Sequence, residues 1–128
     1  MLIKLPTEKS VSDASAALLA AVQAHHFYLL EVLNLREDMA KKGMKFTRDC
    51  LIYEVCQPQP EMPAYDETMT VSTALSSRIS IYEEGGHTVL AALNPTNLLA
   101  MFNAPSLDGM AHEVEITIVR ILEEAAAS

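Results

Sequence analysis

Several features that mark particular protein classes are scarce in this chain of 128 residues. It holds two cysteines, too few for the disulfide framework of a small secreted protein. It holds four glycines, and none has the spacing of a phosphate-binding loop. Nine basic residues face seventeen acidic ones, and the resulting charge of −8 repels nucleic-acid backbones and anionic lipid surfaces. We therefore expect a protein that binds neither nucleic acid nor membranes.

The uncharged stretch from Ala14 to Leu30 is also too short to span a membrane. A spanning helix needs roughly 20 apolar residues, and Gln23 interrupts this stretch. It is not typical of a signal peptide either, because Glu8 and Asp13 stand where basic residues would be needed. We expect a cytoplasmic protein.

Half of the residues in the chain are apolar. A chain of this length and composition forms one domain and buries roughly two-thirds of the surface that it exposes when unfolded. We therefore expect a single domain over residues 1–128 that needs neither a disulfide nor a metal to fold.

The first half of the chain alternates between strand and helix patterns. The predicted elements are a strand at 2–5, a helix that begins after the N-cap Ser10, a buried strand at 27–33, a short polar helix at 36–42 closed by Gly43, and a strand at 50–56. The helix is supported by apolar residues at helical spacing, namely Val11, Ala14, Leu18 and Val22.

The second half contains the clearest local signal, the pair Gly85-Gly86 between two β-rich runs at 78–83 and 87–93. Two glycines in such a turn predict a β-hairpin, because both turn positions need positive φ. Before it, prolines stop the sheet pattern and a short helix is expected at 64–69; after it, helices are expected at 95–102 and 106–128. Strands mixed with helices in this order predict an α+β fold.

Four segments resemble a known family in their order along the chain. They are the helix from Ser10 leading into His-Phe-Tyr-Leu at 26–29, Leu-Ile-Tyr-Glu-Val-Cys-Gln-Pro at 51–58, Leu-Ser-Ser-Arg-Ile-Ser-Ile-Tyr-Glu at 75–83, and Asn94-Pro95. Over residues 10–102 the chain resembles the bacterial domain-of-unknown-function 302 family. It departs from the family pattern at His26, where the family turns with glycine, at Gln57 in place of asparagine, and at Ser76 in place of proline.

This resemblance implies a fold and no activity. The implied fold is β-α-β(4)-α, like half of the TATA-box-binding protein, with a curved antiparallel sheet, helices on one face, and often a homodimer. It assigns no catalytic residue. The likeness to a DNA-binding fold does not carry DNA binding to this chain, because the chain is strongly acidic.

Alternation along the predicted strands separates an apolar face from a mixed one. The apolar face would be covered by helices, because burying an unpaired Glu54 or Arg78 would be costly. The mixed, uncovered face is our candidate binding face for a second subunit or a small molecule, and it collects Glu54, Cys56, Arg78, Ser80 and Tyr82. The alternative is that Glu54 and Arg78 form a plain cross-strand ion pair on a solvated or dimeric face.

The two cysteines can act only separately. At about 3.3 Å per residue along one strand, Cys50 and Cys56 lie roughly 20 Å apart, beyond the reach of a disulfide. Cys56 is the candidate reactive thiol, because it ends the strand and a nearby Arg78 would lower its pKa. Against this, the chain has no Cys-x-x-Cys motif, and a free cysteine often serves as a small buried hydrophobe.

No metal, other cofactor or catalytic residue is predicted. His25 and His26 are adjacent and point in different directions, and no other ligand stands at metal-binding spacing. The leading hypothesis is a non-enzymatic, homodimeric binding or interaction module that uses the uncovered sheet face. The alternative is a thiol-based sulfur-transfer or redox protein that uses Cys56.

Overall fold

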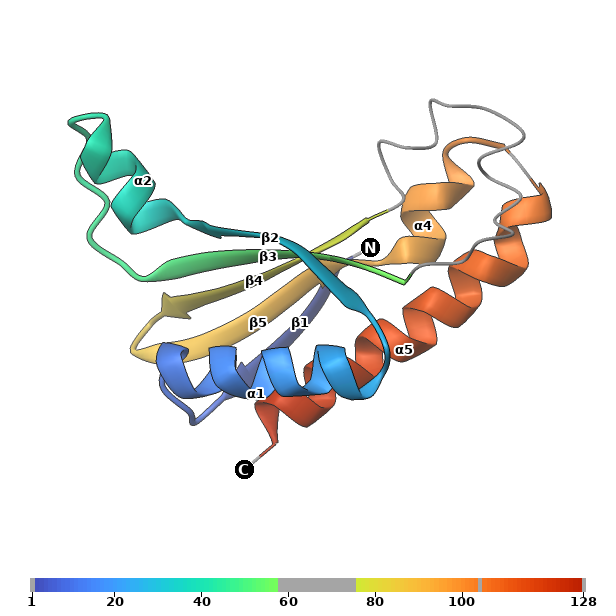
Figure 1. The fold of residues 1–128 in the computed structure, drawn as a ribbon, viewed down its shortest axis with the longest axis horizontal. Helices are drawn as coiled ribbons and strands as arrows, with labels where there is room; N and C mark the ends of the chain where they lie inside the picture. The colour runs from blue at the N-terminus through green and yellow to red at the C-terminus, as the bar shows by residue number, and fades with distance from the viewer. Residues whose placement is uncertain (1, 58–75, 104, 128) are drawn as a thin grey trace.

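A computed structural model describes residues 2–57, 76–103 and 105–127, which form one antiparallel sheet with helices packed on it (Figure 1). The elements are β1 Leu2–Thr7, α1 Val11–Ala24, β2 Tyr28–Asn34, α2 Leu35–Lys41, β3 Cys50–Cys56, β4 Ser77–Glu84, β5 His87–Leu93, α4 Pro95–Ala100, the 3-10 turn η2 Pro105–Leu107 and α5 Asp108–Ala126. The strand order is β1-β5-β4-β3-β2, and every neighbouring pair is antiparallel. This confirms the predicted α+β fold.

The short helix α2 divides the run of four strands that the family resemblance implies. The local sequence predicted it, because a polar helical segment at 36–42 is closed by a glycine. The helix predicted at 64–69 lies outside the described residues.

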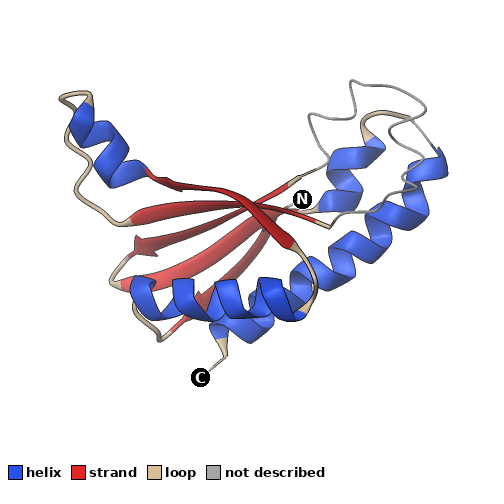
Figure 2. Cartoon of the chain, viewed as in Figure 1, coloured by secondary structure: helices blue, strands red, loops and turns tan. Residues whose placement is uncertain are grey.

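The core lies between the sheet and the helices α1 and α5, which pack on the same face (Figure 2). This two-layer arrangement buries one face of the sheet and one stripe of each helix. The largest fully buried side chains in this layer are Leu18, Val55, Ile79, Ile81, Leu90, Ile118, Ile121 and Leu122. A smaller apolar cluster of Leu99, Leu107 and Ala111 fastens α4 to α5.

The start of α1 follows the prediction. The Ser10 hydroxyl accepts a hydrogen bond from the Asp13 amide at 3.0 Å, which satisfies one of the free N–H groups of the first turn. The apolar stripe of the helix is buried, as expected from its spacing.

The end of α1 is a Schellman motif with a histidine at the left-handed position. His26 has φ of 60°. Its amide donates to the Gln23 carbonyl at 3.0 Å, and the Phe27 amide donates to the Val22 carbonyl at 2.9 Å. Phe27 and Val22 are both buried in the core, so the motif also fixes where the chain leaves the helix. The family's glycine turn is therefore retained, with a histidine in the conformation that glycine adopts most easily.

α2 ends in the same motif with a glycine. Gly43 has φ of 77°, its amide donates to the Ala40 carbonyl at 3.1 Å, and the Met44 amide donates to the Met39 carbonyl at 2.9 Å. The predicted cap at Gly43 is confirmed.

The predicted hairpin is also confirmed. Gly85 and Gly86 join β4 to β5 with φ of 58° and 81°. The helix α5 forms despite four consecutive β-branched residues at 116–119, because its apolar stripe packs on the sheet and on α1.

One prediction about β2 is wrong. It is a strand, as expected from its apolar run, but it is not buried. It lies at the edge of the sheet, and none of its residues is buried. Tyr28 is 61% exposed and Leu30 is 55% exposed. The reason is topological: an apolar run shows that a strand can be buried, whereas the tertiary arrangement decides whether helices reach it.

Within the described ranges, no helix is both long enough and apolar enough to cross a membrane.

Candidate functional site

The structure places the five residues of the candidate binding face on one side of the sheet, opposite α1 and α5. In the β3–β4 register, Glu54 lies opposite Arg78, Ile52 opposite Ser80, and Cys50 opposite Tyr82. Because directly opposite residues share a face and alternate residues along a strand do too, Cys56 belongs to the same side. The neighbouring pair of Tyr53 and Ile79 lies on the helix-covered side and is buried.

Glu54 is the central polar group on this open face. Arg78 Nη2 lies 3.8 Å from Glu54 Oε2, and the Ser76 hydroxyl donates to Glu54 Oε1 at 2.9 Å. On the other side, Glu31 of β2 lies directly opposite Glu54. The side chain of Arg78 is 61% exposed, and an ion pair this open to water contributes only about 0–1 kcal/mol to stability. The cross-strand ion pair that the sequence suggested is therefore present, and it contributes little to the stability of the fold.

The environment of Cys56 does not favour a thiolate. Partial burial raises the pKa of its thiol, and the Glu54 carboxylate raises the pKa further. The expected lowering of the pKa by Arg78 is not found, because the charge that acts on the thiol is that of Glu54. Burial likewise raises the pKa of Cys50, although Arg48 opposes it. Both thiols are free, and neither has the lowered pKa that a reactive cysteine needs.

A second polar group on the open face lies at the opposite edge of the sheet, where β1 pairs with β5. Lys4 Nζ donates to Glu84 Oε1 at 3.0 Å, and this hydrogen bond and charge raise the pKa of Lys4, with a further contribution from Tyr82. Beside the pair lies an open cavity of about 350 Å³, lined by Lys4, Pro6, Glu84, His87 and Val89. The sequence did not predict the Lys4–Glu84 pair or this cavity, because nothing in the local pattern shows which strand pairs with β1.

His25 and His26 both lie at the end of α1, where their surroundings are structural. His25 Nε2 lies 2.8 Å from Glu124 Oε2 and links the end of α1 to the end of α5. His26 occupies the left-handed turn position. Over residues 2–57, 76–103 and 105–127, no group of three or more His, Cys, Asp or Glu side chains could hold a metal ion.

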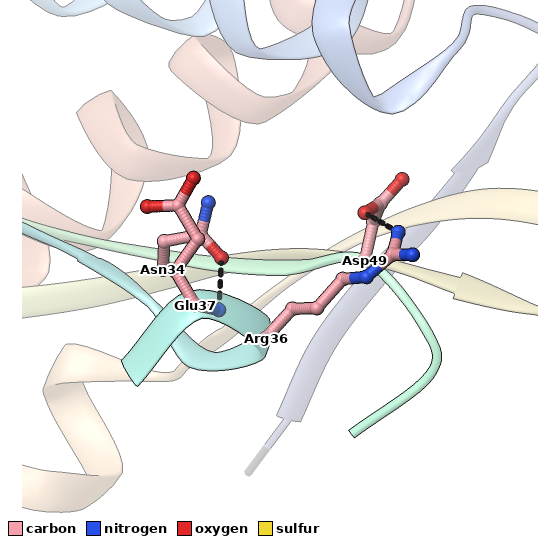
Figure 3. Close-up of polar contacts among 4 residues, drawn as sticks. All are labelled: Asn34, Arg36, Glu37 and Asp49. Atoms are coloured by element: carbon pink, nitrogen blue, oxygen red, sulfur yellow. Dashed lines mark hydrogen bonds and ion pairs between the residues drawn. The ribbon is translucent and has the colours of Figure 1, made fainter. Parts of the chain in front are cut away.

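A separate concave region lies at the end of the sheet that faces the start of α1. Its centre is Asp49, which accepts a hydrogen bond from Arg36 Nη1 at 3.0 Å (Figure 3). Beside it, the Asn34 side-chain oxygen caps α2 by accepting a hydrogen bond from the Glu37 amide at 3.1 Å. No local sequence pattern singles out these residues, because residues 34–37 and Asp49 belong to two separate segments that only the fold brings together.

Comparison with known protein families identifies the family to which this fold belongs. The model of the domain of unknown function DUF302 matches residues 3–125. The chain belongs to the DUF302 family. The match extends beyond residues 10–102, where the resemblance was recognised, and includes nearly all of β1 and of α5.

The crystal structure of an uncharacterised conserved DUF302 protein from Bacillus stearothermophilus has the same fold. The TM-score is 0.88, the identity is 24%, and the superposition covers 97% of each chain. A comparison with curated proteins finds no match. Family membership and fold are therefore shown, and the function has to be argued from this chain's own surfaces.

Proposed function

We propose that this DUF302 protein is a non-enzymatic interaction module that pairs with a second copy of itself through β2 and the adjoining open face of the sheet. The observation that carries the proposal is the row of exposed apolar side chains on β2: Tyr28 at 61%, Leu29 at 42%, Leu30 at 55% and Val32 at 45% exposure.

The two edges of the sheet differ in how they are protected. An edge strand exposes unpaired N–H and C=O groups, and proteins usually block such edges with proline or lysine. The β1 edge carries Lys4 and Pro6, whereas β2 contains neither residue type and has Glu31 as its one charged residue. Apart from Glu31 and the β-bulge between Leu29 and Glu31, this edge is apolar and carries none of these blocking features, which suits it to pairing with another strand.

Charge favours a second copy as the partner. Residues 36–48 contain five basic and two acidic residues, a local charge of +3, so the rest of the chain carries −11. This segment includes all of α2 except Leu35, and α2 has no buried residue and projects from the sheet (Figure 1). When two β2 strands pair antiparallel, α2 of one copy comes beside the start of β2 in the other copy. At the start of β2, His25 contacts Glu124 of the acidic helix α5. The basic segment 36–48 of one copy would therefore lie beside the acidic α5 of the other copy.

Sedimentation velocity at micromolar concentration tests the proposal. We expect the protein to be dimeric, and we expect Leu30→Lys to make it monomeric, because lysine at an edge strand opposes pairing. The matched control is Ile116→Lys on α5, an apolar residue with 40% exposure away from β2, which should remain dimeric. A monomeric wild type would refute the proposal, and a dimeric Leu30→Lys protein would exclude β2 as the interface.

Ionic strength provides a second readout. If residues 36–48 contact the acidic surface of the other copy, added salt should weaken the dimer by screening these charges. Dimer affinity that does not change with salt would exclude the electrostatic part of the proposal.

A further inference from the structure

Two of the exposed apolar residues of β2 face the side of the sheet that carries the helices. Leu29 lies opposite Val55 in the β2–β3 register, and Val32 lies opposite Tyr53. Directly opposite residues share a face, and Val55 and Tyr53 belong to the core that α1 and α5 cover. Even so, Leu29 is 42% exposed and Val32 is 45% exposed. The apolar layer beneath the helices therefore continues to the β2 edge, where it is only partly covered.

Leu19 of α1 belongs to the same surface. It is 38% exposed and follows Ser15 by one helical turn, so the two residues lie on the same flank of α1. Ser15 lines one cavity together with Asn34, the last residue of β2, and the end of α1 leads into the start of β2. One helical turn of about 5.4 Å corresponds to nearly two residues of a strand, so Leu19 lies at the level of Val32. We call Leu19, Leu29 and Val32 the helix-side patch.

Antiparallel pairing of two β2 strands determines where the helix-side patch lies in the proposed dimer. Two identical antiparallel strands of one sheet are related by a two-fold axis perpendicular to the sheet. Such an axis does not exchange the two faces of the sheet, so the helices of both copies lie on the same side. The helix-side patches of the two copies then adjoin each other across the paired strands.

The β-bulge in β2 selects the register of this pairing. Leu30 is the extra residue of the bulge, so Tyr28 faces the open side and both Leu29 and Val32 face the helix side. When the two-fold axis passes just after Leu30, Leu29 lies opposite Val32 of the other copy, on the helix side. Tyr28 then lies opposite Leu33 of the other copy, on the open side. A shift by one residue would place a helix-side residue opposite an open-side one.

We infer that a second copy of the chain covers the helix-side patch, so that α1 as well as β2 belongs to the dimer interface. This inference rests on the proposed pairing through β2 and adds the other face of the sheet to it. Leu29 of each copy packs on Val32 of the other copy, and Leu19 of each α1 covers this contact. The patch contains no charged residue, so burying it against its own copy removes apolar surface from water at no electrostatic cost.

Leu19→Lys tests the contribution of α1. Leu19 lies outside β2, so this variant leaves the edge strand unchanged. We expect the dimer dissociation constant from sedimentation velocity to rise by about tenfold or more, because a charge would stand among apolar side chains. The matched control is Ala20→Lys, at an exposed position opposite the buried stripe of α1. It adds the same charge and should leave the dissociation constant unchanged.

A cysteine pair tests the register. In a chain that carries Cys50→Ser and Cys56→Ser, the further changes Leu29→Cys and Val32→Cys place thiols opposite each other in the two copies. Opposite residues of a strand pair have Cα atoms about 4.5–5.5 Å apart, within the range of a disulfide. Oxidation should therefore give a covalent dimer on a non-reducing gel. Leu29→Cys alone is the control, because its two copies lie three residues apart along the strands, roughly 10 Å.

The outcomes separate this inference from the proposed function. A monomeric wild type would refute the pairing through β2 itself. If the wild type is dimeric and Leu30→Lys is monomeric, but Leu19→Lys dimerises as tightly as the wild type, β2 is the interface and α1 lies outside it. Equal weakening by Ala20→Lys would also exclude α1, because charge alone would explain both results. A missing covalent dimer in the double variant, or equal cross-linking by Leu29→Cys alone, would exclude the register.

Discussion

The two Schellman motifs allow a quantitative prediction about His26. Both motifs make the same pair of backbone hydrogen bonds, but one places histidine and the other glycine at the left-handed position. A residue with a side chain costs about 1–2 kcal/mol in this conformation. We therefore predict that His26→Gly stabilises the protein.

The magnitude follows from two opposing effects. Relief of the left-handed strain favours the variant by about 1–2 kcal/mol. Glycine also gives the unfolded chain more freedom, which costs about 0.4–1 kcal/mol. The net gain in the free energy of unfolding lies between about 0 and 1.6 kcal/mol, with a central value of about 0.8 kcal/mol. For 128 residues, an unfolding entropy of about 2.1 cal/mol/K per residue converts the central value to a rise in Tm of about 3 °C.

The assay is urea unfolding together with calorimetry, at one pH and one protein concentration. His26→Ala is the control, because it removes the imidazole but keeps a Cβ in the left-handed conformation. Since His26 is exposed, the loss of its ring alone should matter little, and His26→Ala should not gain stability.

The converse variant is Gly43→Ala. A Cβ at Gly43 would contact nothing within 4 Å, so its cost comes from φ of 77° alone. We expect it to destabilise the end of α2 by about 1 kcal/mol. If His26→Ala gained as much as His26→Gly, or if His26→Gly lost stability, left-handed strain would not be the reason.

Three further predictions follow from the core, the first cap and the thiols. Leu18→Ala removes a side chain of α1 that has 0% exposure and packs against α5 and the sheet. Urea titrations should show a free energy of unfolding lower by about 3–4 kcal/mol. A loss below about 1 kcal/mol would show that this site is not tightly packed. Ser10→Ala removes the cap on the Asp13 amide and should cost about 1 kcal/mol, whereas Ser10→Gly should cost only a few tenths; equal losses would exclude the cap as the cause. Because the folded state raises the pKa of Cys56, iodoacetamide should alkylate the folded thiol more slowly than the unfolded one near pH 8. Above the ordinary thiol pKa the unfolded chain ionises first, so stability should fall as pH rises there. Faster alkylation of folded Cys56 than of the unfolded chain would contradict this and reopen the thiol function.

The elements predicted best are those whose physical cause is local. The Ser10 cap, the glycine hairpin and the Gly43 cap each depend on residues within one turn, and each is present. The shared face of Glu54 and Arg78 followed from alternation, since a strand places every second residue on one side.

The features that failed or were missed depend on distant segments. The thiol prediction assumed that Arg78 would lower the pKa of Cys56. Instead, partial burial and Glu54, which lies on the same strand as Cys56, raise this pKa. The concave region at Asp49 is lined by residues of α1, β2 and β3, and no local pattern shows that the fold brings these segments together.

By itself the sequence determined an acidic α+β chain, the type of nearly every element and the two faces of the central strands. These follow from local conformation and periodicity, which each segment carries alone. Only the tertiary structure decided that the apolar β2 is an exposed edge, because burial depends on which elements reach a strand. The same holds for the concave region at Asp49 beside α1, because a cavity forms between elements and no single element's sequence specifies it.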